Sequence, residues 1–352
     1  MRIRRALSFN DVLLVPRHTT VFSRSDVNLS TKVAGLKLEI PIIAANMSSV
    51  CEAEMAIALG RIGGLGIIHR MCSVDEEREM LCQASAGYAP PPGRQNQQLQ
   101  VGFSIGVGPD WRARMEACRP YGQIVCLDVA HADSNRVLDL LQSYFKDFGD
   151  YPLIIGNIAT ADAARRLKEA IPERYYSSIA LKVGIGGGSL CTTRIKTGFG
   201  MPTLQSVADV RQETSGVPDI IADGGIASSG DIVKSLVAGA NAVMLGSLLA
   251  GTEEAPGDLI RDEHGTLMKQ YRGSASFSDK QKRGEATRNV EGESTLVPYR
   301  GKVVDVIGDL LDGIRSGLSY GGSSDIPSLQ EHVEFAEITT HGYRESLPHG
   351  KL

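Results

Sequence analysis

A cysteine follows a glycine-rich turn in residues 183–194, whose sequence is VGIGGGSLCTTR. Glycine adopts backbone angles closed to other residues and lets a ligand approach bare amides, so Ser189 and the nearby N–H groups could hold an anion. Cys191 would then lie over the group that the anion anchors. A thiol becomes a nucleophile when amide dipoles or a cation such as Arg194 stabilise the thiolate, and Thr193 is placed to relay a proton. The alternative is a glycine-rich loop beside a buried structural cysteine.

Two later glycine-rich segments could bind phosphate. They are ADGGI at residues 222–226 and MLGSLLAG at residues 244–251. Glycine amides at the end of a strand, followed by a helix N-terminus, form a common phosphate site. Asp223 can accept hydrogen bonds from two neighbouring hydroxyls, which suits a ribose, although an aspartate here could also close an Asx turn. A nucleoside monophosphate would satisfy both observations.

These segments belong to a repeating pattern of strands and helices. Continuous apolar runs, typical of buried parallel strands, alternate with amphipathic segments that open near Ser, Thr or Asp N-caps. Eight such units over about 200 residues favour an α/β fold of the closed (β/α)8 barrel type over a doubly wound sheet. The expected strands are residues 40–45, 65–69, 99–105, 124–129, 153–157, 179–183, 219–223 and 242–246, and four of the expected helices are residues 134–145, 161–170, 203–213 and 229–238.

A polar side chain lies at the carboxyl end of nearly every expected strand, which is where barrels place their chemistry. Turns after strands are polar in any fold, so part of this set is expected to be structural. The set is Asn46, His69, Arg70, Asp128, His131, Asn157, Cys191, Asp223 and Ser247.

Length, net charge and cysteine spacing limit the number of domains and the kinds of partner. The 352 residues could form one large barrel or two domains, and the pattern above favours a single domain over residues 1–352. A net charge of -4 gives no reason to expect nucleic acid or a membrane surface as partner. The six cysteines form no CxxC pair, which predicts reduced thiols without structural zinc. No signal-peptide pattern or membrane-length apolar run is present, so we expect a cytoplasmic protein.

A polar segment rich in Gly, Ser, Lys and Arg, at about residues 272–297, follows the eighth unit. It shows no apolar periodicity, and long loops of this kind often act as lids over a site. Glu291 lies at its far end and could return to the site as a proton donor, although an exposed glutamate in a basic loop is more often a solvated charge. Residues 298–352 form a C-terminal segment, with helical spacing over 303–318.

The chain resembles the IMP dehydrogenase and GMP reductase family over nearly its whole length. The cysteine segment is the most specific of the shared motifs. The resemblance implies a (β/α)8 barrel, assembled as a homotetramer, that binds a purine monophosphate such as GMP or IMP together with a nicotinamide cofactor. The motifs that carry it are FNDVLLVP at residues 9–16, GIIHR at 66–70, CLDVAHADS at 126–134, GNIAT at 156–160, the cysteine segment at 183–194, IADGGI at 221–226 and GSLLAGTEEAPG at 246–257.

The resemblance also assigns roles to individual residues. It makes Cys191 the nucleophile that bonds to C2 of the purine, with Thr193 beside it. Asp128, Asn157 and Arg70 would face the cofactor. The substrate would be held at the phosphate by Ser189, Gly224, Gly225, Gly246, Ser247 and Tyr271, at the ribose by Asp223, and at the base by Ser274 and Ala275.

One position departs from the family pattern. Gly187 stands where the family usually has proline. The neighbouring carbonyls of Gly186, Gly188 and Cys191 resemble a monovalent-cation site of the dehydrogenases, which would bind K+. A looser turn puts that cation in doubt.

Several features favour the reductase branch, in which NADPH reduces GMP to IMP with release of ammonia. Residues 71–98 are too short for the CBS modules that dehydrogenases usually insert there. Residues 272–290 contain no tyrosine, whereas the dehydrogenase flap carries an Arg-Tyr pair that activates water. YRGSASFSD at 271–279 and RNVEG at 288–292 look like the short reductase flap. The resemblance then pairs Glu291 with Thr193 to protonate the departing ammonia.

Three alternatives remain open from the sequence. The first is an IMP dehydrogenase, which oxidises IMP with NAD and hydrolyses the adduct. The second is an FMN-dependent barrel oxidoreductase, in which the cysteine segment would have no task. The third is a nucleotide-binding barrel without activity, which the presence of Cys191, Thr193 and Glu291 disfavours.

Overall fold

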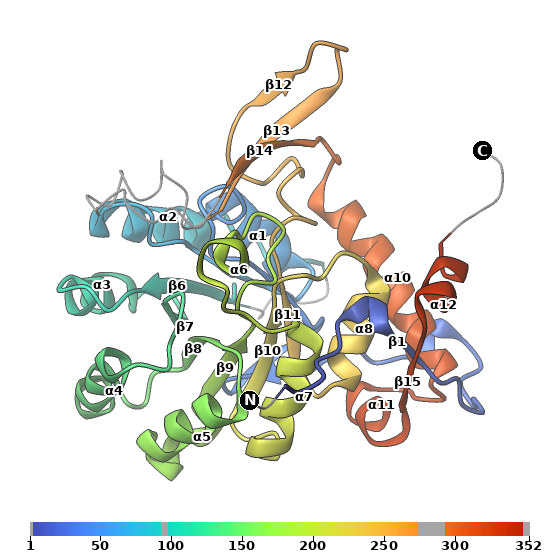
Figure 1. The fold of residues 1–352 in the computed structure, drawn as a ribbon. Helices are drawn as coiled ribbons and strands as arrows, with labels where there is room; N and C mark the ends of the chain where they lie inside the picture. Colours follow the sequence, from blue (N-terminus) through green and yellow to red (C-terminus); the bar gives the residue numbers. More distant parts are fainter. Residues whose placement is uncertain (1–2, 93–97, 274–292, 348–352) are drawn as a thin grey trace.

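The computed structural model describes residues 3–92, 98–273 and 293–347. Eight parallel strands close into a barrel in the order β10-β11-β4-β5-β6-β7-β8-β9, with helices around it (Figure 1). The strands consist almost wholly of buried apolar residues, as expected for parallel strands covered on both faces. Their bounds are β4 Ile42–Ala44, β5 Leu65–Ile67, β6 Val101–Ile105, β7 Ile124–Asp128, β8 Leu153–Ile158, β9 Ile179–Val183, β10 Asp219–Asp223 and β11 Ala242–Leu245.

The eight predicted strands are therefore confirmed, with ends that differ by up to two residues. Pairing of β11 with β4, which aligns Val243 with Ile42, closes the ring. The predicted (β/α)8 barrel is the observed fold.

Helices connect consecutive strands and cover the outside of the barrel. Local N-caps fix where they begin: Ser73 caps α2 through a capping box with Glu76, and Thr160 accepts from the backbone N–H of Ala163 at the start of α5. Their bounds are α1 Ala53–Arg61, α2 Val74–Gly87, α3 Trp111–Cys118, α4 Asn135–Asp147, α5 Ala161–Ala170, α7 Thr203–Thr214, α8 Ser229–Val237 and α10 Val303–Tyr320.

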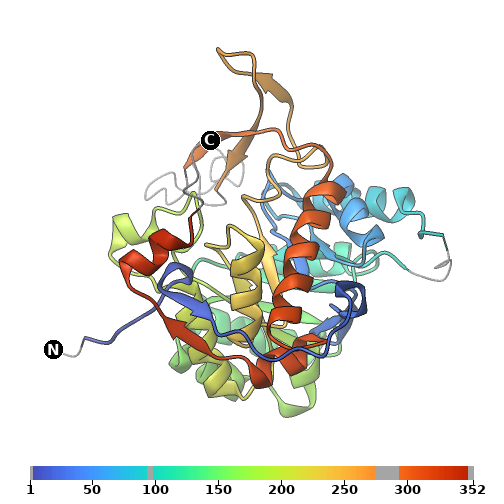
Figure 2. The ribbon, with the colours of Figure 1, turned by 90° about the vertical axis from the view of Figure 1, so that its right-hand side faces the viewer.

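A three-stranded antiparallel sheet, not expected from the sequence, projects from the barrel on both sides of the predicted polar segment (Figures 1 and 2). It consists of β12 Leu259–Arg261, β13 Leu267–Arg272 and β14 Ser294–Pro298. The predicted loop at 272–297 is therefore wrong at its ends, because Arg272 pairs with Ser294 and Tyr271 with Thr295. β12 and β14 are largely exposed, so neither shows the apolar alternation that marks a half-buried strand.

Two two-stranded antiparallel sheets lie outside the eight-stranded barrel. Near the N-terminus, β1 Val12–Leu14 pairs with β15 Phe335–Glu337, and β2 Thr31–Val33 pairs with β3 Leu36–Leu38. The described residues also include three helices of at most seven residues, which are α6 Thr193–Thr197, α11 Ile326–His332 and α12 Thr340–Glu345, and 3₁₀ turns at Phe9–Asp11, Arg24–Asp26 and Glu173–Ser178.

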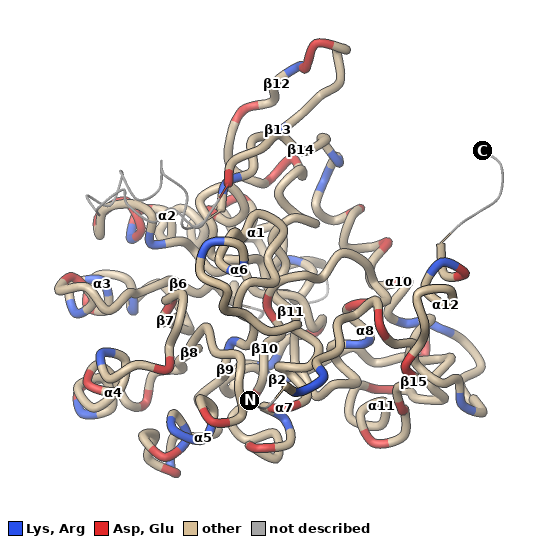
Figure 3. Tube along the Cα trace, viewed as in Figure 1, with Lys and Arg blue, Asp and Glu red and all other residues tan. Residues whose placement is uncertain are grey.

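The distribution of charged residues and the state of the cysteines agree with the expectations from composition. Acidic and basic residues are interspersed along the outer helices (Figure 3). All six cysteines are free thiols, as predicted. Within the described ranges, every helix is too short or too polar to span a membrane.

Candidate functional site

A cavity of about 430 Å³ lies at the carboxyl ends of the barrel strands. It gathers residues predicted from seven different segments of the sequence. Ser274, Ala275 and Glu291 fall outside the described residues. The predicted residues that line the cavity are Arg70, Asp128, Asn157, Gly186, Gly188, Ser189, Cys191, Thr193, Asp223, Gly224, Gly225, Gly246, Ser247 and Tyr271.

Cys191 and Thr193 lie side by side at the start of α6. The Sγ of Cys191 lies 3.1 Å from Oγ1 of Thr193, within range of an S–H···O hydrogen bond. The backbone N–H of Cys191 donates to the carbonyl of Gly188 at 3.0 Å, which fixes the turn below the thiol. Both side chains are half-buried and line the cavity. A nucleophile with a hydroxyl at proton-transfer distance is therefore present.

Arg194 lies elsewhere than the sequence suggested. Its guanidinium donates to the carbonyl of Met201, and its side chain packs across Gly186 and Gly200. A Cβ at Gly186 would lie 2.7 Å from Cγ of Arg194. Arg194 therefore braces the far side of the cysteine loop, and the structure does not place it as the cation beside the thiolate.

A close contact explains why glycine, and not proline, stands at position 187 of this loop. A Cβ at Gly187 would lie 2.7 Å from Oγ1 of Thr203, the first residue of α7. A proline there would force Thr203 to move. The carbonyl of Gly188 already accepts the N–H of Cys191, and K+ binding by Gly186, Gly188 and Cys191 stays a prediction.

The predicted phosphate-binding residues form one wall of the cavity. Gly224 and Gly225 have φ angles of 90° and 78°, which favour glycine, and their bare backbone approaches the cysteine loop. The hydroxyl of Tyr271 lies 3.5 Å from Oγ of Ser189. A Cβ on Gly246 would lie 3.0 Å from the same tyrosine hydroxyl. Burial raises the pKa of Tyr271, so its hydroxyl stays protonated and can donate.

Lys182 is a site residue that the sequence analysis missed. Its ammonium lies 3.0 Å from Oδ1 of Asp128 and 3.3 Å from Oδ2 of Asp223, and it also donates to Oδ1 of Asn157. The amide of Asn157 in turn donates to Oδ2 of Asp223 at 2.7 Å and to the carbonyl of Gly184. A signal was available, because a lysine inside the apolar run of β9 has to be paired when buried.

The charges of this group stabilise one another. Burial opposes the charged form of Lys182, but Asp128 and Asp223 outweigh it and raise the pKa of the lysine. Burial also opposes ionisation of Asp128, yet Lys182 and Arg70 lower its pKa below the usual value. Lys182 and Asp128 on the floor of the cavity are therefore both charged at neutral pH.

A second cavity, of about 1340 Å³, adjoins the first, and Arg70 and Met71 line both. The guanidinium of Arg70 donates to the backbone carbonyl of Asp128 at 3.1 Å and lies directly over Gly106, where a Cβ would be 2.9 Å from its Cζ. Within the described part of the chain, the buried Nε of Arg70 has no hydrogen-bond partner. An unpaired buried donor between two connected cavities fits a long anionic ligand such as a dinucleotide.

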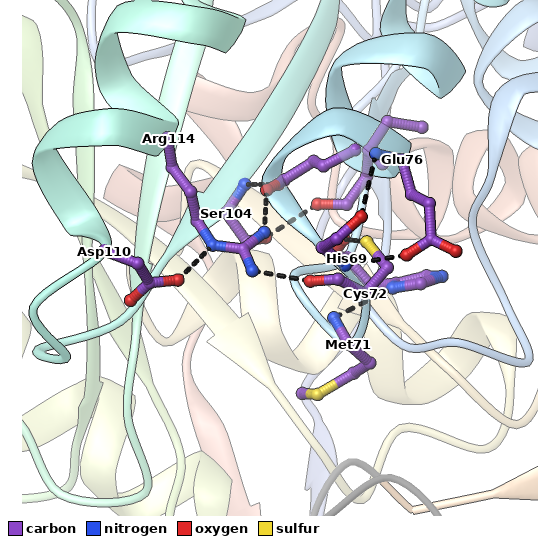
Figure 4. Close-up of polar contacts among 10 residues, drawn as sticks. His69, Met71, Cys72, Glu76, Ser104, Asp110 and Arg114 are labelled. Carbon is purple, nitrogen blue, oxygen red and sulfur yellow. Dashed lines mark hydrogen bonds and ion pairs between the residues drawn. The ribbon is translucent and has the colours of Figure 1, made fainter. Parts of the chain in front are cut away.

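The turn after β5 is held by a buried ion pair of Arg114, whose contact with Cys72 is drawn in Figure 4. Arg114 of α3 pairs with Glu77 of α2 at 2.5 Å and donates to the carbonyl of Cys72. The carboxylate of Glu77 also accepts from the backbone N–H of Ser104 in β6 at 2.8 Å. Burial raises the pKa of Glu77 to about 7, although Arg114 stabilises its carboxylate.

His69 faces this turn rather than the cavity floor. Its Nδ1 accepts from the backbone N–H of Met71 at 3.1 Å, and its Nε2 lies 3.1 Å from Oε1 of Glu52. With Nδ1 as acceptor, Nε2 carries the proton and donates to Glu52. His69 therefore holds the fold of the turn after β5.

Comparisons with known proteins agree with this geometry. The family model described as "IMP dehydrogenase / GMP reductase domain" matches residues 6–349. Inosine-5'-monophosphate dehydrogenase of Nitrosopumilus maritimus is 30% identical, with all of both chains covered, and that of Cryptosporidium parvum is 34% identical over 99% of this chain and 96% of its own.

A solved structure is also similar. It is a cysteine-to-alanine variant of GMP reductase from Trypanosoma brucei in complex with guanosine 5'-monophosphate, 28% identical, with a TM-score of 0.91 and 99% of each chain covered. The barrel, the cysteine loop and these matches together show that the chain belongs to the IMP dehydrogenase and GMP reductase family, an oxidoreductase family that uses a nicotinamide cofactor.

Proposed function

We propose that this protein is a GMP reductase, which converts GMP to IMP and ammonia with oxidation of NADPH. The observation that carries the proposal is the Cys191 and Thr193 pair at 3.1 Å, combined with a segment at 272–290 that contains no tyrosine to activate water. The structural likeness to a GMP reductase that binds guanosine 5'-monophosphate supports the same assignment.

In this proposal the thiolate of Cys191 adds to C2 of GMP. Thr193, together with Glu291, delivers a proton to the amino group, so the C2–N bond breaks and ammonia leaves. A nucleotide joined to the sulfur at C2 remains. Hydride addition at C2 then lets the C–S bond break, which returns the electron pair to Cys191 and releases IMP.

The bound nicotinamide would supply the hydride. The residues that would hold it are Asp128, Asn157 and Arg70, whose unpaired Nε lies at the junction of the two cavities. The substrate would lie across the barrel mouth, with its phosphate on the amides of Gly225 and Gly246 and the hydroxyl of Tyr271. Asp223 would take the ribose, and Ser274 with Ala275 the base. We further propose a cytoplasmic homotetramer.

A dehydrogenase is the second candidate, because the curated relatives are named inosine-5'-monophosphate dehydrogenase. The alignment with the Nitrosopumilus maritimus protein runs over 482 positions, so that relative carries segments that this chain lacks. The alignment with the Cryptosporidium parvum dehydrogenase runs over only 395 positions, so chain length does not separate the two activities and the assay below does.

A paired assay separates the two activities. The protein is incubated with GMP and NADPH, and in parallel with IMP and NAD, while reduced-nicotinamide absorbance is followed and products are identified. We expect loss of absorbance with formation of IMP and ammonia in the first mixture only. A gain in the second mixture, with XMP as product, would establish the dehydrogenase instead.

A Cys191→Ala variant provides the control for chemistry. The nucleophile is lost while the rest of the cavity is kept, so turnover should fall by more than about a thousandfold with GMP still bound. Full turnover in this variant would exclude the covalent route.

A further inference from the structure

The ammonium of Lys182 joins two carboxylates that the proposed function assigns to different ligands. Asp128 lies at the end of β7 and Asp223 at the end of β10, on opposite sides of β9, which carries Lys182. The two ion pairs, at 3.0 and 3.3 Å, meet at one Nζ. The side chain of Lys182 is 3% exposed, and those of Asp128 and Asp223 are 16% and 21% exposed.

Lys182 also determines which carboxylate oxygen of Asp223 is left to accept a hydrogen bond from a ligand. Lys182 and the amide of Asn157 both bind Oδ2 of Asp223, at 3.3 and 2.7 Å. Among the described residues, the contacts of this carboxylate fall on Oδ2 alone, which leaves Oδ1 to accept from a ligand. Without a cation, these two partly buried carboxylates would repel each other and draw protons instead of accepting hydrogen bonds.

We infer that Lys182 is a positioning residue that orients Asp223 toward the ribose hydroxyls of the nucleotide and Asp128 toward the nicotinamide half of the cofactor. The inference deepens the proposed function and rests on it for the identity of the two ligands. Because one ammonium serves both carboxylates, its loss should weaken both ligands. Loss of either carboxylate alone should weaken only the ligand on its own side.

The test compares binding of GMP and 2'-deoxy-GMP by calorimetry, in the absence of turnover. The wild-type protein should prefer GMP by roughly tenfold, because a hydroxyl that donates to a carboxylate makes a strong hydrogen bond. In Lys182→Met we expect this preference to fall close to one, and NADPH affinity to fall by about tenfold. Lys182→Arg keeps the charge and should recover part of both effects. A merely structural lysine would leave the ratio between the two nucleotides unchanged.

Lys234→Met is the matched control. Lys234 is a half-buried lysine of α8 that donates to the backbone carbonyl of Phe9, away from the cavity. This variant should keep the wild-type preference for GMP. If Lys182→Met does not fold, Asp128→Asn/Lys182→Met removes one negative and one positive charge together, and it too should lose the preference.

An unchanged preference for GMP in the folded Lys182 variants would overturn the inference, as would a wild-type protein that binds the two nucleotides equally. Failure of the proposed function gives a different result. Wild-type protein that binds GMP with ribose discrimination but turns over neither nucleotide would reject the reductase and leave the role of Lys182 standing.

Discussion

Thr193 places its hydroxyl 3.1 Å from the sulfur of Cys191, and the two residues are separated in the chain only by Thr192. This arrangement depends on the short helix α6, which begins at Thr193, two residues after the cysteine. The relationship gives the first of four predictions.

Thr193→Val should lower the rate of ammonia release by about a hundredfold, because proton transfer by a positioned group typically contributes that much or more. GMP affinity should change little. Thr192→Val is the neighbouring control, since its buried Oγ1 has no hydrogen-bond partner in the described structure. Equal losses of activity in the two variants would show that the loop, and not the Thr193 hydroxyl, matters.

Gly106→Ala should act on the cofactor alone. The added Cβ would lie 2.9 Å from Cζ and Nη1 of Arg70, at the flexible end of that side chain, so the guanidinium must shift while the barrel is kept. Losing a charged hydrogen bond at this junction should raise the KM for NADPH roughly tenfold with the KM for GMP unchanged. Steady-state kinetics measures both, and an equal rise in both constants would contradict the assignment of Arg70.

Arg114→Met should destabilise the protein. It leaves Glu77 buried without its ion pair, which costs about 3 kcal/mol in the free energy of unfolding measured by urea denaturation. Glu77→Met/Arg114→Met removes both charges and should recover part of the loss. Arg112→Met, beside it on α3, breaks only a partly exposed pair with Asp147 and should cost less than about 1 kcal/mol. Similar losses of stability in the Arg112 and Arg114 variants would contradict a special role for the buried ion pair of Arg114 with Glu77.

Asp219 should give the fold a pH-dependent stability. Burial raises its pKa to about 6 from 3.8, so the folded chain binds this proton more tightly than the unfolded chain. Its contribution is fully present below pH 3.8 and is lost as the pH rises through 6. Protonation of Asp219 contributes roughly 3 kcal/mol to the free energy of unfolding at low pH, and about half of this contribution is lost between pH 5 and pH 8.

Urea unfolding of the wild type and of Asp219→Asn at those two pH values isolates this contribution. The variant has no titrating group here, so the wild type should lose about 1.5 kcal/mol more than the variant between the two pH values. Parallel pH profiles would show that Asp219 does not titrate in this way.

The barrel was predictable because its eight strands are buried on both faces and so appear as continuous apolar runs. β9 and β10 matched to the residue, and α5 did so because Thr160 caps its start. β12 and β14 were missed because exposed strands held by backbone pairing leave no periodic pattern.

The candidate site was predictable in its motifs but not in its contacts. Cys191, Asp223 and Gly246 could be found from their neighbours in sequence. The position of Lys182 between Asp128 and Asp223 depends on how strands far apart in sequence adjoin in the barrel. The contact of Arg194 with Met201 depends on how the loop after β9 folds back on itself.

The most direct test of the reductase assignment follows the hydrogen that NADPH transfers to the nucleotide. The protein is supplied with GMP and with NADPH that carries deuterium at the transferred position, and the nucleotide product is examined by mass spectrometry and proton NMR. The proposal predicts IMP with deuterium at C2 and one ammonia released for each NADPH oxidised. IMP without deuterium at C2, or recovery of unchanged GMP while IMP and NAD give XMP, would contradict it.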